Sequence, residues 1–169
     1  MAIDFTLPPE VEEIRLRVRS FIDTVVRPME EEIEESGRDR DVLVRNYVSM
    51  RAKAKEAGLW LPHMPEEWGG MGLGHVELAM VQAEAAKSYY GPWVFNCQAP
   101  DEGNMYLLGK VGSPEIQSHF LEPMVRGEKR SAFFMTEPAG DGGAGSDPSM
   151  MQTTCRPDGN HWVINGRKT

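Results

Sequence analysis

The residues with the clearest chemical potential lie in one stretch near the C-terminal end of the chain. An apolar run, Phe133-Phe134-Met135, leads into the hydroxyl of Thr136, the carboxylate of Glu137 and then Pro138. A glycine-rich segment follows and closes with Gly145-Ser146-Asp147. Glycines let several backbone N–H groups converge on an anion, and a serine adds one more donor. The pattern is compatible with a strand end and loop that bind a flat polar ligand carrying a phosphate. Taken alone, however, it favours a surface loop that leaves a buried strand, because Asp141 and Asp147 would repel a phosphate.

The net charge, the apolar stretches, and the spacing of the cysteines and histidines argue against several other kinds of protein and site. The net charge of −8 argues against non-specific binding of nucleic acid, and no apolar stretch is long enough to span a membrane. The 2 cysteines have neither metal-type nor disulfide-framework spacing, which favours a reducing compartment. The histidines also lack metal-ligand spacing, so we expect no metal site and surface or hydrogen-bonded positions for His63, His75, His119 and His161.

The elements before this stretch are predicted to be helices. Apolar residues recur at helical spacing from Val11 to Met29, where Pro28 predicts a kink or break. A second helix should begin with Asp39 or Asp41 as its N-cap and end at Gly58.

The middle of the chain continues the helical pattern. The segment from Val76 to Ala86 is apolar on nearly every side, which is typical of a helix buried within a bundle. Residues 93–109 form another apolar segment, interrupted near Pro100. Ser113-Pro114-Glu115 predicts a helix start that continues to about Arg126.

Strands are expected only after residue 130. Ala132 to Thr136 is a short apolar run consistent with a buried strand. Gln152–Arg156 and His161–Asn165 should form a β-hairpin, with Trp162 and Ile164 on a buried face. The sequence therefore predicts a mainly α chain, with an all-α domain at 1–129 and a short β region at 130–169, which the resemblance described next identifies as the start of a β-domain.

Three motifs together resemble the flavin-binding signature of the acyl-CoA dehydrogenases. They are Phe134 to Pro138, Gly145 to Asp147, and Val163-Ile164-Asn165-Gly166-Arg167-Lys168. The loop Met64 to Gly74 resembles a Pro-Glu-x-aromatic-Gly-Gly loop of the same family, and the patch Asn96 to Met105 resembles its longer-chain subgroup. This chain is a few residues longer than the family pattern through Gly140 to Gly143.

The resemblance implies a fold and a cofactor. The fold would be the family's N-terminal helical bundle followed by the first strands of an incomplete β-barrel domain. The cofactor would be FAD, and Ser146 would also contact the acyl-CoA substrate. Glu137 would belong to the flavin-binding strand and not act as the catalytic base, which the family takes from a later helical domain, so no catalytic residue is assigned here. The residues implied to bind FAD are Phe134, Met135, Thr136, Gly145 and Ser146.

The implied activity is the α,β-dehydrogenation of acyl-CoA thioesters in fatty acid β-oxidation. Electron-transfer flavoprotein would accept the electrons, and the full-length enzyme would be a homo-oligomer in the bacterial cytoplasm or the mitochondrial matrix. One alternative is a relative with different chemistry, such as an acyl-CoA oxidase or a flavin monooxygenase. Another is a truncated, non-catalytic helical interaction module.

Overall fold

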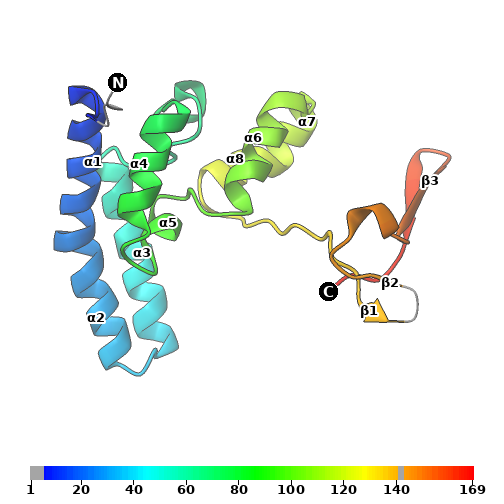
Figure 1. Cartoon of the computed structure of the whole chain (residues 1–169), viewed down its shortest axis with the longest axis horizontal. Helices are drawn as coiled ribbons and strands as arrows, with labels where there is room; N and C mark the ends of the chain where they lie inside the picture. Colours follow the sequence, from blue (N-terminus) through cyan, green and yellow to red (C-terminus); the bar gives the residue numbers. More distant parts are fainter. Residues whose placement is uncertain (1–5, 141–142) are drawn as a thin grey trace, which may run out of the picture. The chain divides into compact units, whose positions relative to one another are not determined.

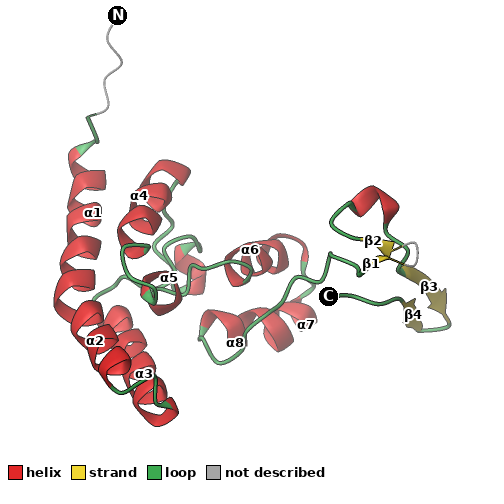
Figure 2. Cartoon of the chain, turned by 60° about the horizontal axis from the view of Figure 1, so that its bottom comes forward, coloured by secondary structure: helices red, strands yellow, loops and turns green. Residues whose placement is uncertain are grey.

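The computed structural model describes residues 6–140 and 143–169, and the chain divides into two compact units. The helical unit ends at Ser131, and the strand unit comprises Ala132–Thr169. The helices and strands are labelled in Figures 1 and 2. Their bounds are α1 Pro9–Phe21, α2 Arg27–Glu35, α3 Arg40–Glu56, α4 His75–Ala85, α5 Gly91–Val94, α6 Asp101–Val111, α7 Pro114–Ile116, α8 Glu122–Val125, β1 Ala139–Gly140, β2 Gly143–Ala144, β3 Thr154–Asp158 and β4 His161–Asn165.

Two helices of the helical unit are interrupted by a π-helical turn just before a proline. Between α1 and α2 the turn covers Ile22–Val26 and Pro28 follows it. Between α7 and α8 it covers Gln117–Leu121 and Pro123 follows. Proline has no amide hydrogen and its ring displaces the carbonyl four residues earlier, so the preceding turn must widen. The interruption predicted at Pro28 is therefore confirmed, one turn ahead of the proline itself.

The predicted helix starts are held by side-chain caps. An Asp39 carboxylate oxygen accepts hydrogen bonds from the amides of Asp41 at 3.0 Å and Val42 at 3.2 Å. The Ser113 hydroxyl oxygen accepts one from the amide of Ile116 at 3.3 Å. These bonds satisfy amides that have no partner inside the helix, so α3 and α7 begin where the sequence predicts.

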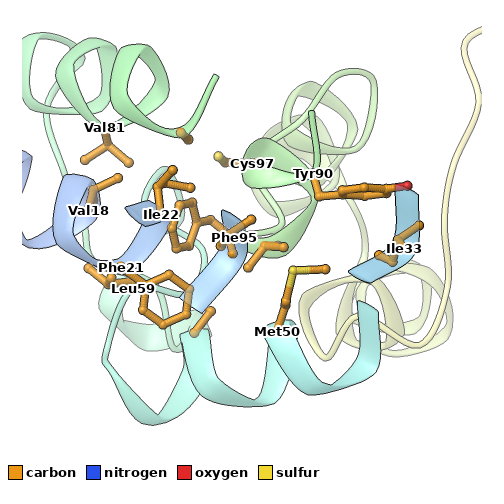
Figure 3. Close-up of a cluster of buried hydrophobic side chains, with 14 residues drawn as sticks. Val18, Phe21, Ile22, Ile33, Met50, Leu59, Val81, Tyr90, Phe95 and Cys97 are labelled. Atoms are coloured by element: carbon orange, nitrogen blue, oxygen red, sulfur yellow. The ribbon is translucent and has the colours of Figure 1, made fainter. Parts of the chain in front are cut away.

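Buried apolar side chains of the helical unit form two clusters. The first lies between α1, α2, α3 and α4, and Figure 3 shows Phe95 near its centre, with its ring centroid 5.5 Å from that of Phe21. The second cluster joins the loop after α3 to α6 and α8. Its members are Trp60, Leu61, Met64, Met105, Leu121 and Met124.

Helix α4 is less buried than its composition predicts. Val81 and Ala85 are buried, but Val76 is 57% exposed. The helix packs on α1 with one face, and that face also carries the buried carboxylate of Glu84. Glu84 binds Arg15 and Arg19 of α1, so the contact is partly ionic and the expected all-round burial is wrong.

The strand unit contains two small antiparallel sheets. In the first, Ala139 of β1 lies opposite Ala144 of β2. In the second, β3 and β4 form the predicted hairpin, with Asp158 opposite His161 across a turn that contains Gly159 at φ 59°. A short 3₁₀ turn over Pro148–Met150 links the two sheets.

Two predictions about burial in the strand unit are wrong. Residues 132–136 form no strand, and Phe133 and Phe134 are 64% and 71% exposed. Trp162 and Ile164, expected on a buried face of the hairpin, are 67% and 68% exposed. An apolar run is buried only where another element covers it, and the described part of this unit supplies none over either surface.

Among the described residues, no helix has the length and the hydrophobicity that a membrane crossing requires.

Candidate functional site

The strand unit is organised around the carboxylate of Glu137. This side chain is buried, with 4% of the residue exposed. It accepts hydrogen bonds from the amide of Gln152 at 2.9 Å, and from the amide and the hydroxyl of Thr153 at 2.8 and 2.6 Å. The ammonium of Lys168 lies 3.1 Å away. One carboxylate thus joins the segment after the glycine-rich loop to the end of the chain.

These contacts determine the charge state of Glu137. The Thr153 hydroxyl and the amides of Gln152 and Thr153 hold the pKa of Glu137 at about 2, well below its ordinary value. A carboxylate with so low a pKa is a weak proton acceptor near neutral pH. Its geometry suits a structural role.

The backbone of Glu137 brings the predicted binding residues together. Its amide donates to the carbonyl of Gly145 at 3.0 Å, which places Thr136 beside the Gly145-Ser146 turn. At the ends of the expected extension, Gly140 pairs with Gly143 across β1 and β2, and Asp141 and Gly142 lie outside the described residues. Ala139 pairs with Ala144, so this pairing lies directly beside the contact between Glu137 and Gly145.

The other edge of this segment contacts the C-terminal residues. The Lys168 ammonium donates to the carbonyl of Met135 at 3.0 Å, and the amide of Thr169 donates to the carbonyl of Thr136 at 3.1 Å. Residues 135–137 therefore lie between the Gly145 turn and residues 168–169. Lys168 belongs to a motif that the sequence already marked, whereas the role of Thr153 had no sequence signal.

The side chains predicted to bind the cofactor are accessible. Phe134 is 71% exposed and Met135 is 41% exposed, and Thr136 and Ser146 are exposed as well. Gly145 is half-buried and adopts φ 57°, the left-handed conformation that glycine tolerates best. The backbone of the segment is held in place while its side chains remain free to contact a ligand.

A separate open pocket of about 630 Å³ lies on the strand unit. Its walls include Glu137, Gln152, Thr153, Asn165 and Arg167. None of the five residues predicted to bind FAD lines it. The pocket therefore adjoins the Glu137 and Thr153 side chains that hold the site together, but not the side chains predicted to contact FAD.

One histidine departs from the expectation of a surface or partnered position. His63 is 8% exposed, and neither ring nitrogen has a hydrogen-bond partner among the described residues. Burial lowers the pKa of His63 to about 4, so the ring is neutral near pH 7.

The described residues contain no cluster of three or more histidine, cysteine or acidic side chains that could hold a metal ion.

The chain matches known proteins along most of its length. The family profile for the acyl-CoA dehydrogenase N-terminal domain matches residues 8–128. The chain belongs to the acyl-CoA dehydrogenase family. It is 38% identical over 163 residues to acyl-CoA dehydrogenase family member 11 of Gallus gallus, and this match covers 93% of the chain but 20% of the relative.

Solved structures show the same relationship. A Mycobacterium abscessus protein, provisionally assigned as an acyl-CoA dehydrogenase, is similar with a TM-score of 0.81 and 36% identity, over 97% of this chain and 42% of that one. An acyl-CoA dehydrogenase from Bacillus anthracis, solved in complex with FAD, is similar with a TM-score of 0.65 and 28% identity, over 96% of this chain and 26% of that one. The predicted fold, a helical N-terminal domain and the start of a β-domain, is confirmed.

Proposed function

We propose that this chain is the N-terminal part of a flavin-dependent acyl-CoA dehydrogenase that oxidises acyl-CoA thioesters between the α and β carbons. Membership of the family supports the reaction class. The observation that carries the proposal is the hydrogen bond from the Glu137 amide to the Gly145 carbonyl, because it brings two of the three motifs that resemble the flavin-binding signature side by side.

The residues of the candidate site fit a flavin. Thr136 presents an exposed hydroxyl that can hydrogen-bond a flat heterocycle, and Met135 offers backbone groups next to it. The exposed ring of Phe134 adds apolar surface. The Bacillus anthracis relative, a structure with FAD, supports the choice of this cofactor. When bound, FAD supplies the acceptor for the hydride that leaves the substrate.

The Gly145-Ser146 turn would contact the charged part of the ligands. Glycine at a positive φ allows consecutive amides to face an anion, and the exposed Ser146 hydroxyl adds a further donor. We assign this turn to the flavin pyrophosphate, and Ser146 also to the acyl-CoA. Electron-transfer flavoprotein is the electron acceptor proposed for the complete enzyme.

The proton-abstracting base lies outside the described residues in this proposal. Glu137, the acidic residue of the motif, has its carboxylate occupied by donors from Gln152, Thr153 and Lys168. The chain would accordingly position the flavin and part of the substrate, while another part of the complete protein removes the α-proton.

Replacing Thr136 by valine tests the assignment. Valine keeps the shape of the side chain but removes the hydroxyl, so the complete natural protein carrying Thr136→Val should lose flavin during gel filtration more readily than the wild type. Thr154→Val is the matched control, because Thr154 is an exposed threonine on β3 outside the motif. Equal flavin retention and turnover in Thr136→Val and the wild type would contradict the proposal.

A further inference from the structure

A second buried carboxylate lies in the helical unit, at the point where the chain leaves it. Asp101 is the first residue of α6, and 1% of it is exposed. Its side chain makes no cap on α6; the residue at the N-cap, Pro100, has no side-chain cap either. Instead it faces residues 130 and 131, the last two of the helical unit.

Four donors converge on this carboxylate. The amide and the hydroxyl of Ser131 donate to one oxygen at 2.7 and 2.6 Å. The other oxygen accepts from the Gln98 amide group and from the Arg130 guanidinium. Hydrogen bonds to a buried, ionised acceptor are among the stronger polar interactions in proteins. We call Asp101, Arg130 and Ser131 the exit anchor.

Neighbouring side chains support the exit anchor. The Asn104 side-chain amide donates to the Ser131 hydroxyl oxygen at 2.9 Å. The Arg130 guanidinium carbon lies 4.1 Å from the centroid of the Trp93 ring, within the range of a cation–π contact. Burial alone would raise the pKa of Asp101, but the Ser131 and Arg130 hydrogen bonds outweigh it and lower that pKa. The carboxylate is therefore charged near neutral pH.

The position of the exit anchor in the sequence gives it a role beyond packing. Ser131 is the last residue of the helical unit, and Thr136 lies five residues further along the chain. Met135 and Thr136 are held at their far end by Lys168 and Thr169, and residues 132–134, which belong to no helix or strand, connect them to the anchor. The anchor therefore fixes the end of this connection that lies in the helical unit. We propose that Asp101 is a positioning residue for the flavin-binding segment, acting through Arg130 and Ser131. This proposal rests on the proposed function.

Asp101→Asn is the sharpest test, carried out in the complete natural protein. Asparagine has the same shape, but its NH₂ group would face the donors of Gln98 and Arg130 and repel them. We expect the dissociation constant of FAD to rise by up to about tenfold, because FAD binding must then also order the residues that Asp101 holds in the wild type. Trypsin should also cleave the flavin-free protein faster at the peptide bond after Arg130, because the hydrogen bonds from Ser131 to residue 101 are weakened.

Glu84→Gln is the matched control. Glu84 is also a buried carboxylate with basic partners, but it joins α1 to α4 and lies far from residue 131 in the sequence. This variant should lower the melting temperature while leaving FAD affinity and cleavage after Arg130 unchanged. Ser131→Ala should reproduce part of the Asp101→Asn effect, and Ser131→Thr, which keeps the hydroxyl, should restore it.

Two outcomes would overturn the proposal. One is that Asp101→Asn and Glu84→Gln change FAD affinity equally, and the other is that Asp101→Asn and Ser131→Ala leave cleavage after Arg130 as in the wild type. A wild-type protein that binds no flavin would refute the proposed function instead. The cleavage comparison needs no flavin, so it would still test the exit anchor.

Discussion

The helical unit and the strand unit are stabilised in different ways. In the helical unit Phe95 is fully buried, whereas in the strand unit Phe134 is 71% exposed. Among the residues of the strand unit whose burial the structure describes, Glu137 alone is buried. Apolar burial contributes about 1.5–3 kcal/mol per large side chain, while a typical hydrogen bond contributes about 1 kcal/mol. The helical unit therefore supplies stability, and the strand unit is a polar framework that fixes geometry.

The largest effect on stability that this contrast predicts comes from replacing one phenylalanine in each unit. Phe95→Ala should reduce the free energy of unfolding by about 3–5 kcal/mol, because it leaves a cavity in the first cluster. Phe134→Ala should change it by less than about 0.5 kcal/mol, since that ring is exposed. Urea unfolding followed by far-ultraviolet circular dichroism measures both values. Similar losses in the two variants would remove the contrast.

Gly166→Ala should damage the strand unit alone. A Cβ atom at Gly166 would lie 2.1 Å from the Thr153 hydroxyl oxygen, so it would push that group away from Glu137. We expect the free energy of unfolding of the strand unit to fall by about 1–3 kcal/mol, as is typical of overpacking. Hydrogen exchange should show faster exchange of the Thr153 amide with unchanged protection in α3. Unchanged exchange at Thr153 would mean that the Glu137 network does not hold this unit together.

Acid should weaken the helical unit through Glu84. Burial would raise the pKa of Glu84, but hydrogen bonds from Arg19, Lys87 and Arg15 hold it at about 2, below its ordinary 4.5. The depressed pKa stabilises the folded state above pH 4.5, and this stabilisation is lost as the pH falls toward 2. The free energy of unfolding is expected to fall by on the order of 1–2 kcal/mol, a figure already reduced because solvent screens these charges.

Glu84→Gln supplies the control for that pH dependence. Its melting temperature, followed by the helical circular dichroism signal, should fall less steeply between pH 4.5 and 2 than that of the wild type. Identical slopes for the two proteins would show that other carboxylates account for the acid response.

The smallest predicted effect has the opposite sign to that of Gly166→Ala. Gly103 lies inside α6, and a Cβ atom added there would meet no atom within 4 Å. Alanine should therefore stabilise the helical unit by about 0.5–1 kcal/mol, by lowering the entropy of the unfolded chain. A lower melting temperature for Gly103→Ala would show that the space around α6 is less open than the structure indicates.

Much of the helical unit could be predicted because its signals are local. The caps at Asp39 and Ser113 and the interruption before Pro28 depend on residues within one turn of the chain. The strand unit was predicted less well, since the burial of Ala132–Thr136 and Trp162 depends on elements distant in sequence. The hairpin itself was predicted, although β3 begins two residues later than expected, because its two strands are close together in the sequence.

The candidate site divides in the same way. The motif residues Met135, Thr136 and Ser146 could be named from sequence, and the structure brings Thr136 beside the Ser146 turn. The partners of the buried carboxylates could not, because Glu137 meets Thr153 and Asp101 meets Ser131 only after folding. Pairings over 16 and 30 residues leave no periodic or spacing signal in a single sequence.

The most direct test of the central claim is the visible spectrum of the complete natural protein under anaerobic conditions, before and after adding acyl-CoA. The account predicts a bound flavin whose absorption band bleaches when an acyl-CoA of suitable chain length is added. A protein purified without flavin, or a flavin band unchanged by short-, medium- and long-chain acyl-CoA, would contradict it.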